Sequence, residues 1–106
     1  MSSFSVRCLY RWLDTPAADP HTYEERITLW SAPNIDDSIA LAEAEAKSYA
    51  AESKCEYLGF CQAYAMYSQV SASAVEVFSL LRDSALAPTE YINTFFFTGT
   101  EREGDA

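Results

Sequence analysis

An apolar side chain at every second position is the feature that most constrains what this chain can fold into. From Phe4 to Trp12 such residues alternate with Ser5, Arg7, Leu9 and Arg11. A period of two is that of a β-strand, whose successive side chains point to opposite faces. The same period recurs in residues 23–32, 56–67 and 74–81. The sequence therefore predicts four strands, the last two with apolar residues on both faces.

Two other segments carry a helical pattern. Residues 34–53 contain an apolar stripe with a period of about 3.6, and its many alanines would let a helix lie close to a sheet. Asn34 is a suitable N-cap, and Asp37 places an acidic side chain in the first turn. Pro88 opens a shorter helix that reaches about Phe96. The stripe of the longer helix consists of Ile35, Ile39, Ala42, Ala46, Tyr49 and Ala50.

The order of these elements is strand, strand, helix, strand, strand, helix, which predicts an α+β fold. We expect a two-layer domain, with an antiparallel four-stranded sheet and the helices on one face. A length of 106 residues fits a single domain over positions 1–106. The acidic, polar residues from about 98–106 are expected to form a frayed tail.

The chain carries a formal net charge of -9 at pH 7. A surface this acidic repels nucleic-acid phosphates, which argues against DNA or RNA as a partner. It suits a basic protein partner, although the same charge also serves solubility alone. No stretch approaches the roughly 18 apolar residues of a membrane span, and the first residues lack the pattern of a secretory signal. We therefore expect a cytoplasmic protein with no membrane partner.

Residues suited to catalysis or metal binding are few. His21 is the only histidine and follows a Pro-rich stretch, so Ser-His-Asp or Cys-His chemistry would depend on a base in a flexible loop. Cys8, Cys55 and Cys61 are odd in number and lack the paired spacing of zinc ligands, which favours free buried thiols. The sequence predicts no catalytic residue, no metal site and no cofactor.

Several segments resemble, in the same order, the bacterial family described as domain of unknown function 4288. The segment "FSVRCLYRW" resembles its first strand, and "YEERITLWSAPNIDDSIALAEAEAKSY" its glutamate-arginine strand and acidic, alanine-rich helix. The segments "YLGFCQAYAMY" and "AVEVFSLL" resemble its later strands, so the resemblance covers residues 4–82. Val75, or Ala74 before it, departs from a glycine that the family tends to have there. The family has no established activity, but small proteins of this sort are often encoded near bacterial polymorphic toxins, which implies an immunity protein.

Charged side chains on the first two strands allow two interpretations. Glu24 and Arg26 share one strand face, and so do Arg7 and Arg11. Opposite charges on neighbouring strands would form a ladder that contributes about 0.2–1 kcal/mol per pair. The alternative is a binding patch on an open sheet face. The residues predicted for that patch are Arg7, Arg11, Tyr23, Glu24, Arg26 and Trp30.

Apolar side chains near the C-terminus predict an interface. The fourth strand has Glu76 as its one charged residue, so at a sheet edge it would lack the usual protection against pairing with another chain. We expect a homodimer where no other partner is present. In the alternative, the second helix covers this strand within one chain and the protein is a monomer. The predicted interface residues are Phe78, Phe95, Phe96 and Phe97.

These observations favour a non-catalytic protein-binding module over an enzyme. The most concrete version is an immunity protein that neutralises a cognate bacterial toxin with a basic domain, since acidic inhibitors gain fast association from electrostatic steering. A small-ligand-binding or enzymatic module that uses the polar sheet face is the alternative. A structural or regulatory accessory role is the third class.

Overall fold

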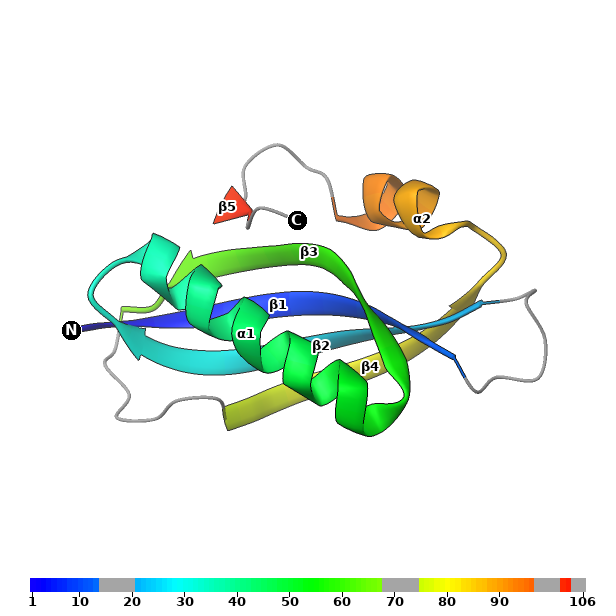
Figure 1. Cartoon of the computed structure of the whole chain (residues 1–106). Coiled ribbons are helices and arrows are strands. Elements are labelled where there is room, and N and C mark those ends of the chain that lie inside the picture. The colour runs from blue at the N-terminus through cyan, green and yellow to red at the C-terminus, as the bar shows by residue number, and fades with distance from the viewer. Residues whose placement is uncertain (14–20, 68–74, 97–101, 104–106) are drawn as a thin grey trace.

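The computed structural model describes residues 1–13, 21–67, 75–96 and 102–103. Four long antiparallel strands and two helices form an α+β fold, in the predicted order ββαββα (Figure 1). A short fifth strand adds to the sheet, whose order is β4-β2-β1-β3-β5. The elements are β1 (Ser2–Trp12), β2 (His21–Ala32), α1 (Ile35–Ser53), β3 (Cys55–Ala65), β4 (Val75–Ser84), α2 (Pro88–Phe95) and β5 (Arg102–Glu103).

The centre of the sheet is the hairpin of β1 and β2. Their pairing runs without a shift from Ser2 opposite Ala32 to Arg11 opposite Tyr23. On its other side β1 pairs with β3, and Cys8 lies directly opposite Cys61. An unbroken register keeps each side chain of the alternating pattern on its own face, so the hairpin carries both cores of the domain.

The helix α1 forms where the sequence predicts it. The side chain of Asn34 accepts a hydrogen bond from the backbone N–H of Asp37 at 2.8 Å, which caps the first turn. At the other end Lys54 adopts the left-handed conformation, with φ of 58°, and its N–H donates to the carbonyl of Ala50. The buried side chains between the caps are mostly alanine, so α1 lies close against the strands. They are Ser38, Ile39, Ala42, Ala46 and Ala50.

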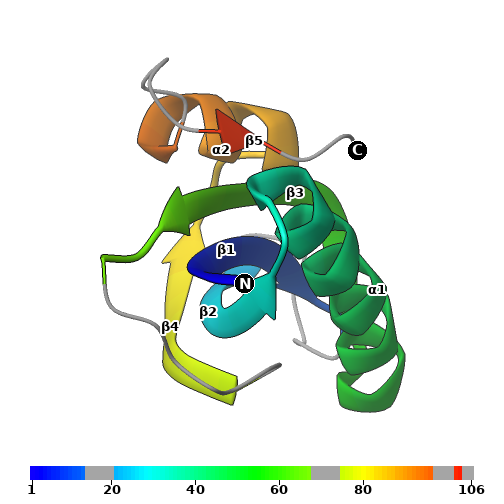
Figure 2. The ribbon, with the colours of Figure 1, turned by 90° about the vertical axis from the view of Figure 1, so that its left-hand side faces the viewer.

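The two helices pack on opposite faces of the sheet, which corrects the predicted placement on one face. Tyr10 of β1 belongs to the core beneath α1, whereas its neighbour Leu9 belongs to the core with Tyr91 and Phe96 at α2. In Figure 2, α1 and α2 lie on different sides of β3. The apolar residues on both faces of the strands explain this arrangement, because each face needs its own cover.

The C-terminal region contributes β5, in which Arg102 pairs with Ala63 and Glu103 with Gln62 of β3. These two residues fall within the segment predicted as a frayed tail, and the rest of that segment lies outside the described residues. Most of the predicted loop before His21 lies outside them as well, and His21 itself is the first residue of β2.

Candidate functional site

The strand β4 forms one edge of the described sheet, with β2 as its single neighbour in the strand order. Along most of its length its side chains are exposed on both faces, unlike those of β1 and β2. The exposed fractions are 52% for Val77, 44% for Phe78, 39% for Leu80 and 55% for Leu81. Soluble proteins rarely leave such a run of apolar residues at an open edge, because the unpaired backbone groups can accept another strand.

The charged residues of β4 are held by other parts of the chain. Glu76 accepts a hydrogen bond from Arg26 at 2.5 Å, and Asp83 accepts one from Thr22 at 2.7 Å. Arg82 lies over the ring of Phe95 at 4.9 Å and donates to the Tyr91 hydroxyl at 3.2 Å. Residues 77–81 between them, "VFSLL", contain no charge, no lysine and no proline. These five residues form the edge run of β4.

Two side chains of the edge run belong to each face of the sheet. Ser79 donates to Glu24 on the α1 side, and Leu81 lies opposite Glu24 in the register. Phe78 lies opposite Ile27 and Leu80 opposite Glu25, on the α2 side. A register shift between Ile27 and Thr28 leaves Val77 as an extra residue, a bulge at one end of the run.

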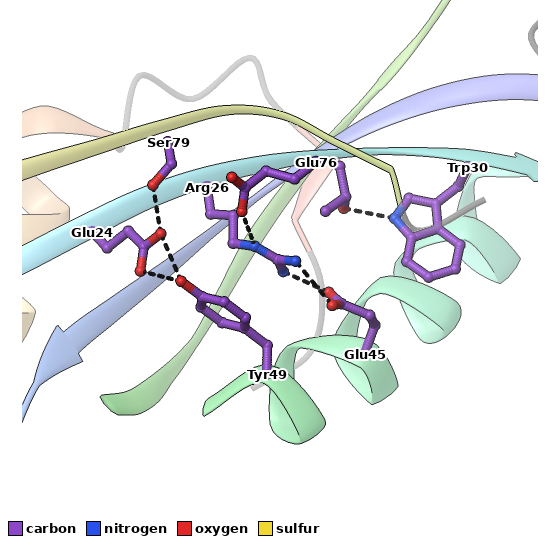
Figure 3. Close-up of polar contacts among 8 residues, drawn as sticks. Glu24, Arg26, Trp30, Glu45, Tyr49, Glu76 and Ser79 are labelled. Atoms are coloured by element: carbon purple, nitrogen blue, oxygen red, sulfur yellow. Dashed lines mark hydrogen bonds and ion pairs between the residues drawn. The ribbon is translucent and has the colours of Figure 1, made fainter. Parts of the chain in front are cut away.

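Arg26 joins β2, α1 and β4 through a nearly buried guanidinium (Figure 3). It donates to both carboxylate oxygens of Glu45 on α1, at 2.7 and 3.0 Å, and to Glu76 on β4. The ring of Tyr49 lies 3.9 Å from the guanidinium carbon, a cation–π contact. Burial alone lowers the pKa of Arg26, but the hydrogen bonds to Glu45 and Glu76 more than reverse this, so the group stays charged.

A buried carboxylate lies beside this guanidinium. Glu24 accepts hydrogen bonds from the Tyr49 hydroxyl at 2.8 and 2.9 Å and from the Ser79 hydroxyl at 2.5 Å. Burial, and next the hydrogen bond to Glu24, raise the pKa of Tyr49 above its ordinary value. Trp30 on the same face donates from its indole N–H to the Thr28 hydroxyl at 2.7 Å. The contacts of Glu24 with Tyr49 on α1 and with Ser79 on β4 fix the position of β4 relative to α1.

A second polar cluster lies on the α2 side. Arg7 forms an ion pair with Glu25 at 3.0 Å, donates to the side chain of Gln62 and covers the ring of Phe96 at 4.8 Å. The fully buried amide of Gln62 donates in turn to the Phe96 carbonyl at 2.7 Å. Arg7 thus holds the end of α2 against the sheet.

The structure does not bring the predicted binding patch together. Arg7, Arg11 and Tyr23 belong to the α2 side, whereas Glu24, Arg26 and Trp30 belong to the α1 side. The physical reason is that Tyr23 and Glu24 are adjacent in a strand, and each face is covered by a helix. Opposite charges do pair, but through partners that the sequence reasoning did not name. These partners are Glu25 for Arg7, Glu56 for Arg11, and Glu45 and Glu76 for Arg26.

The predicted interface phenylalanines separate into three groups. Phe78 and Phe95 are exposed, at 44% and 47%. Phe96 is a core residue packed against Phe60 at 5.9 Å, which corrects its assignment to an interface, and Phe97 lies outside the described residues. The helix α2 does fold back on the sheet, but it covers Tyr23 and its neighbours and leaves the edge run open.

Other residues of these networks were not found by sequence reasoning. Glu45 and Ser79 show no signal in the sequence, since a glutamate on an acidic helix and a serine in a strand are ordinary residues there. Tyr49 was placed on the apolar stripe but not in a polar network. Gln62 did carry a signal, because it is the one amide side chain in residues 57–67, which contain no charged residue.

The cysteines are free and buried. A hydrogen bond with Cys61 and burial raise the pKa of the Cys8 thiol, which keeps it protonated and unreactive. Within residues 1–13, 21–67, 75–96 and 102–103, no three His, Cys, Asp or Glu side chains gather in a way that could hold a metal ion. In the same ranges no helix combines the length and the apolar character needed to cross a membrane.

Comparisons of this chain with protein-family models, with curated proteins and with solved structures found no match. The resemblance to domain of unknown function 4288 therefore stays a prediction.

Proposed function

We propose that this chain is a non-catalytic protein-binding module that contacts its partner through β4. The observation that carries the proposal is the edge run, an uncharged apolar segment exposed on both faces of a sheet edge. Strand addition at such an edge supplies backbone hydrogen bonds, and the alternate side chains supply selectivity. Leu80 and Leu81 offer one apolar contact on each face of the sheet.

Charge indicates what kind of partner would bind. The net charge is -9, and α1 carries five acidic residues against one lysine. This helix covers the face from which Ser79 and Leu81 of the edge run project. A basic protein would be steered towards this side of the molecule, with faster association at low salt. The acidic residues of α1 are Asp36, Asp37, Glu43, Glu45 and Glu52.

The polar side chains support binding rather than catalysis. Arg7, Arg26 and Glu24, the strongest candidates for chemistry, are engaged in contacts that hold the helices to the sheet. Using them on a substrate would require breaking these contacts. We propose, as the concrete form of the function, an immunity protein that occupies a basic domain of a cognate bacterial toxin.

Co-expression with the product of the neighbouring gene tests this function. The expected results are restored growth of cells that express a toxic product and a complex that co-elutes on gel filtration. Leu81→Lys on β4 should abolish the complex, whereas Leu41→Lys, which adds the same charge at a 45% exposed position on α1, should retain the complex and only slow its formation, because the added charge weakens the steering by α1. No rescue and no complex would contradict the immunity role. A complex that survives Leu81→Lys would contradict the use of β4.

A further inference from the structure

We propose that, in the free protein, β4 pairs antiparallel with β4 of a second copy across a two-fold axis at Ser79. The inference rests on the proposed function in one respect, that the edge run is an interaction surface. It adds that a second copy of this chain binds to the edge run, and it gives the register in which the two strands pair. Joining the two edges would turn two sheets into one continuous sheet and pair the exposed backbone groups of both, and the two-fold dimer is the commonest symmetric assembly of soluble proteins.

The faces of the edge run restrict the register. Residues directly opposite each other on antiparallel strands share a face, so a residue on the α1 side must meet one on the α1 side of the second copy. Ser79 and Leu81 belong to that side, and Phe78 and Leu80 belong to the other. Registers that place Ser79 opposite Leu80 are therefore excluded.

Among the registers that remain, the one centred on Ser79 matches apolar side chains best. It places Phe78 opposite Leu80 of the second copy, twice by symmetry; the bulge residue Val77 is not counted, because the register assigns it to neither face. A register centred on Leu80 would instead place Phe78 opposite Arg82, which already lies over the ring of Phe95. The axis at Ser79 also pairs the whole uncharged edge run with itself.

Charge acts on this pairing in two ways. Glu76 and Arg82 flank the edge run at equal distances from Ser79, so each acidic end comes beside a basic end of the second copy. The bulge at Val77 places these two side chains on opposite faces, and we infer no direct ion pair between them. At longer range two copies with a charge of -9 each repel. Because salt screens that repulsion, self-association should strengthen with salt, whereas binding of a basic partner should weaken.

Light scattering on the free protein tests the dimer. The wild-type chain should give twice 11.8 kDa, with a larger dimer fraction at high salt. Leu81→Lys should give a single chain, since lysine is the residue that protects natural edges. Leu41→Lys adds the same charge on α1 and should remain a dimer. A wild-type mass of 11.8 kDa from micromolar to millimolar concentration overturns the proposal, and so does a dimer that Leu81→Lys leaves intact.

A cross-link tests the register even if the lysine variant folds poorly. Opposed Cα atoms in antiparallel strands lie about 4.5–5.5 Å apart, a span that a disulfide bridges. Ser79→Cys should therefore give a covalent dimer on mild oxidation. Ser48→Cys, an exposed control on α1, should not. Equal cross-linking of both variants, or of neither, contradicts an axis at Ser79.

The two proposals fail separately. If the free protein is a monomer that still binds its toxin, the dimer proposal is contradicted and the proposed binding function is not. If it is a dimer that binds no toxin, the proposed immunity function is contradicted and the dimer proposal is not.

Discussion

Replacing Arg26 by methionine tests the network that joins β2, α1 and β4. The guanidinium side chain is 8% exposed and binds Glu45 and Glu76, which are 24% and 42% exposed. A hydrogen bond to a charged group contributes about 1.5–3 kcal/mol, and methionine retains apolar contact with Tyr49. Glu45 and Glu76 keep access to water, but the buried carboxylate of Glu24 loses the positive charge beside it, so the loss reaches the range of a stranded buried charge. We expect Arg26→Met to lower the free energy of unfolding by about 3–5 kcal/mol.

The two glutamates should couple unequally to Arg26. Glu45 receives two hydrogen bonds and is the less exposed partner, whereas Glu76 receives one and is more exposed. A double-mutant cycle of Arg26→Met with Glu45→Gln should give a coupling energy of about 1.5–3 kcal/mol. The cycle with Glu76→Gln should give less than about 1 kcal/mol, because solvent screens that pair.

Urea unfolding, followed by circular dichroism at one protein concentration, measures both cycles, since the stability of a dimer depends on concentration. Added salt should reduce the Glu76 coupling more than the Glu45 coupling. Equal coupling energies, or a larger one for Glu76, would refute the reasoning that solvent exposure decides the strength of each pair.

Three further outcomes follow from the packing and the caps. Tyr91→Ala, which removes a ring stacked on Tyr23 at 4.0 Å, should cost about 3–5 kcal/mol in urea unfolding and release α2. Asn34→Ala should cost about 1 kcal/mol in the same assay, whereas Asn34→Ser should cost far less. Burial raises the pKa of Tyr10 and Tyr57 above 10.0, so the unfolded chain loses these protons first. Stability should therefore fall as pH rises above about 10, and the part of the phenolate absorbance that comes from Tyr10 and Tyr57 should appear only on unfolding.

The sequence predicts the elements of this fold because their patterns are local. Alternation at Phe4 to Trp12 requires only the two-residue repeat of a strand, and the cap at Asn34 requires only the first turn of α1. The side of the sheet on which α2 packs depends on residues far apart in the chain. Tyr91 contacts Tyr23 and Phe96 contacts Phe60. A local sequence pattern does not determine on which face of the sheet these rings pack.

The candidate site was predictable only in part. The lack of protecting charges in the edge run can be read from the sequence. The interface prediction required the fourth strand to lie at a sheet edge, and β4 does lie at one. The predicted polar patch combined side chains by charge, and the structure divides these side chains between two faces of the sheet. Glu45 and Tyr49 reach Arg26 and Glu24 only after α1 has packed on the sheet, so their role depends on tertiary structure.

Amide hydrogen exchange along β4 tests most directly the claim that this edge binds another chain. An edge strand has alternate N–H groups bonded to its neighbour and alternate ones facing solvent. The account predicts that the outward amides of residues 77–81 are protected at millimolar protein and lose that protection on dilution, while amides of the central strand β1 do not change. Identical exchange of these outward amides at every concentration, with or without a basic partner, would contradict it.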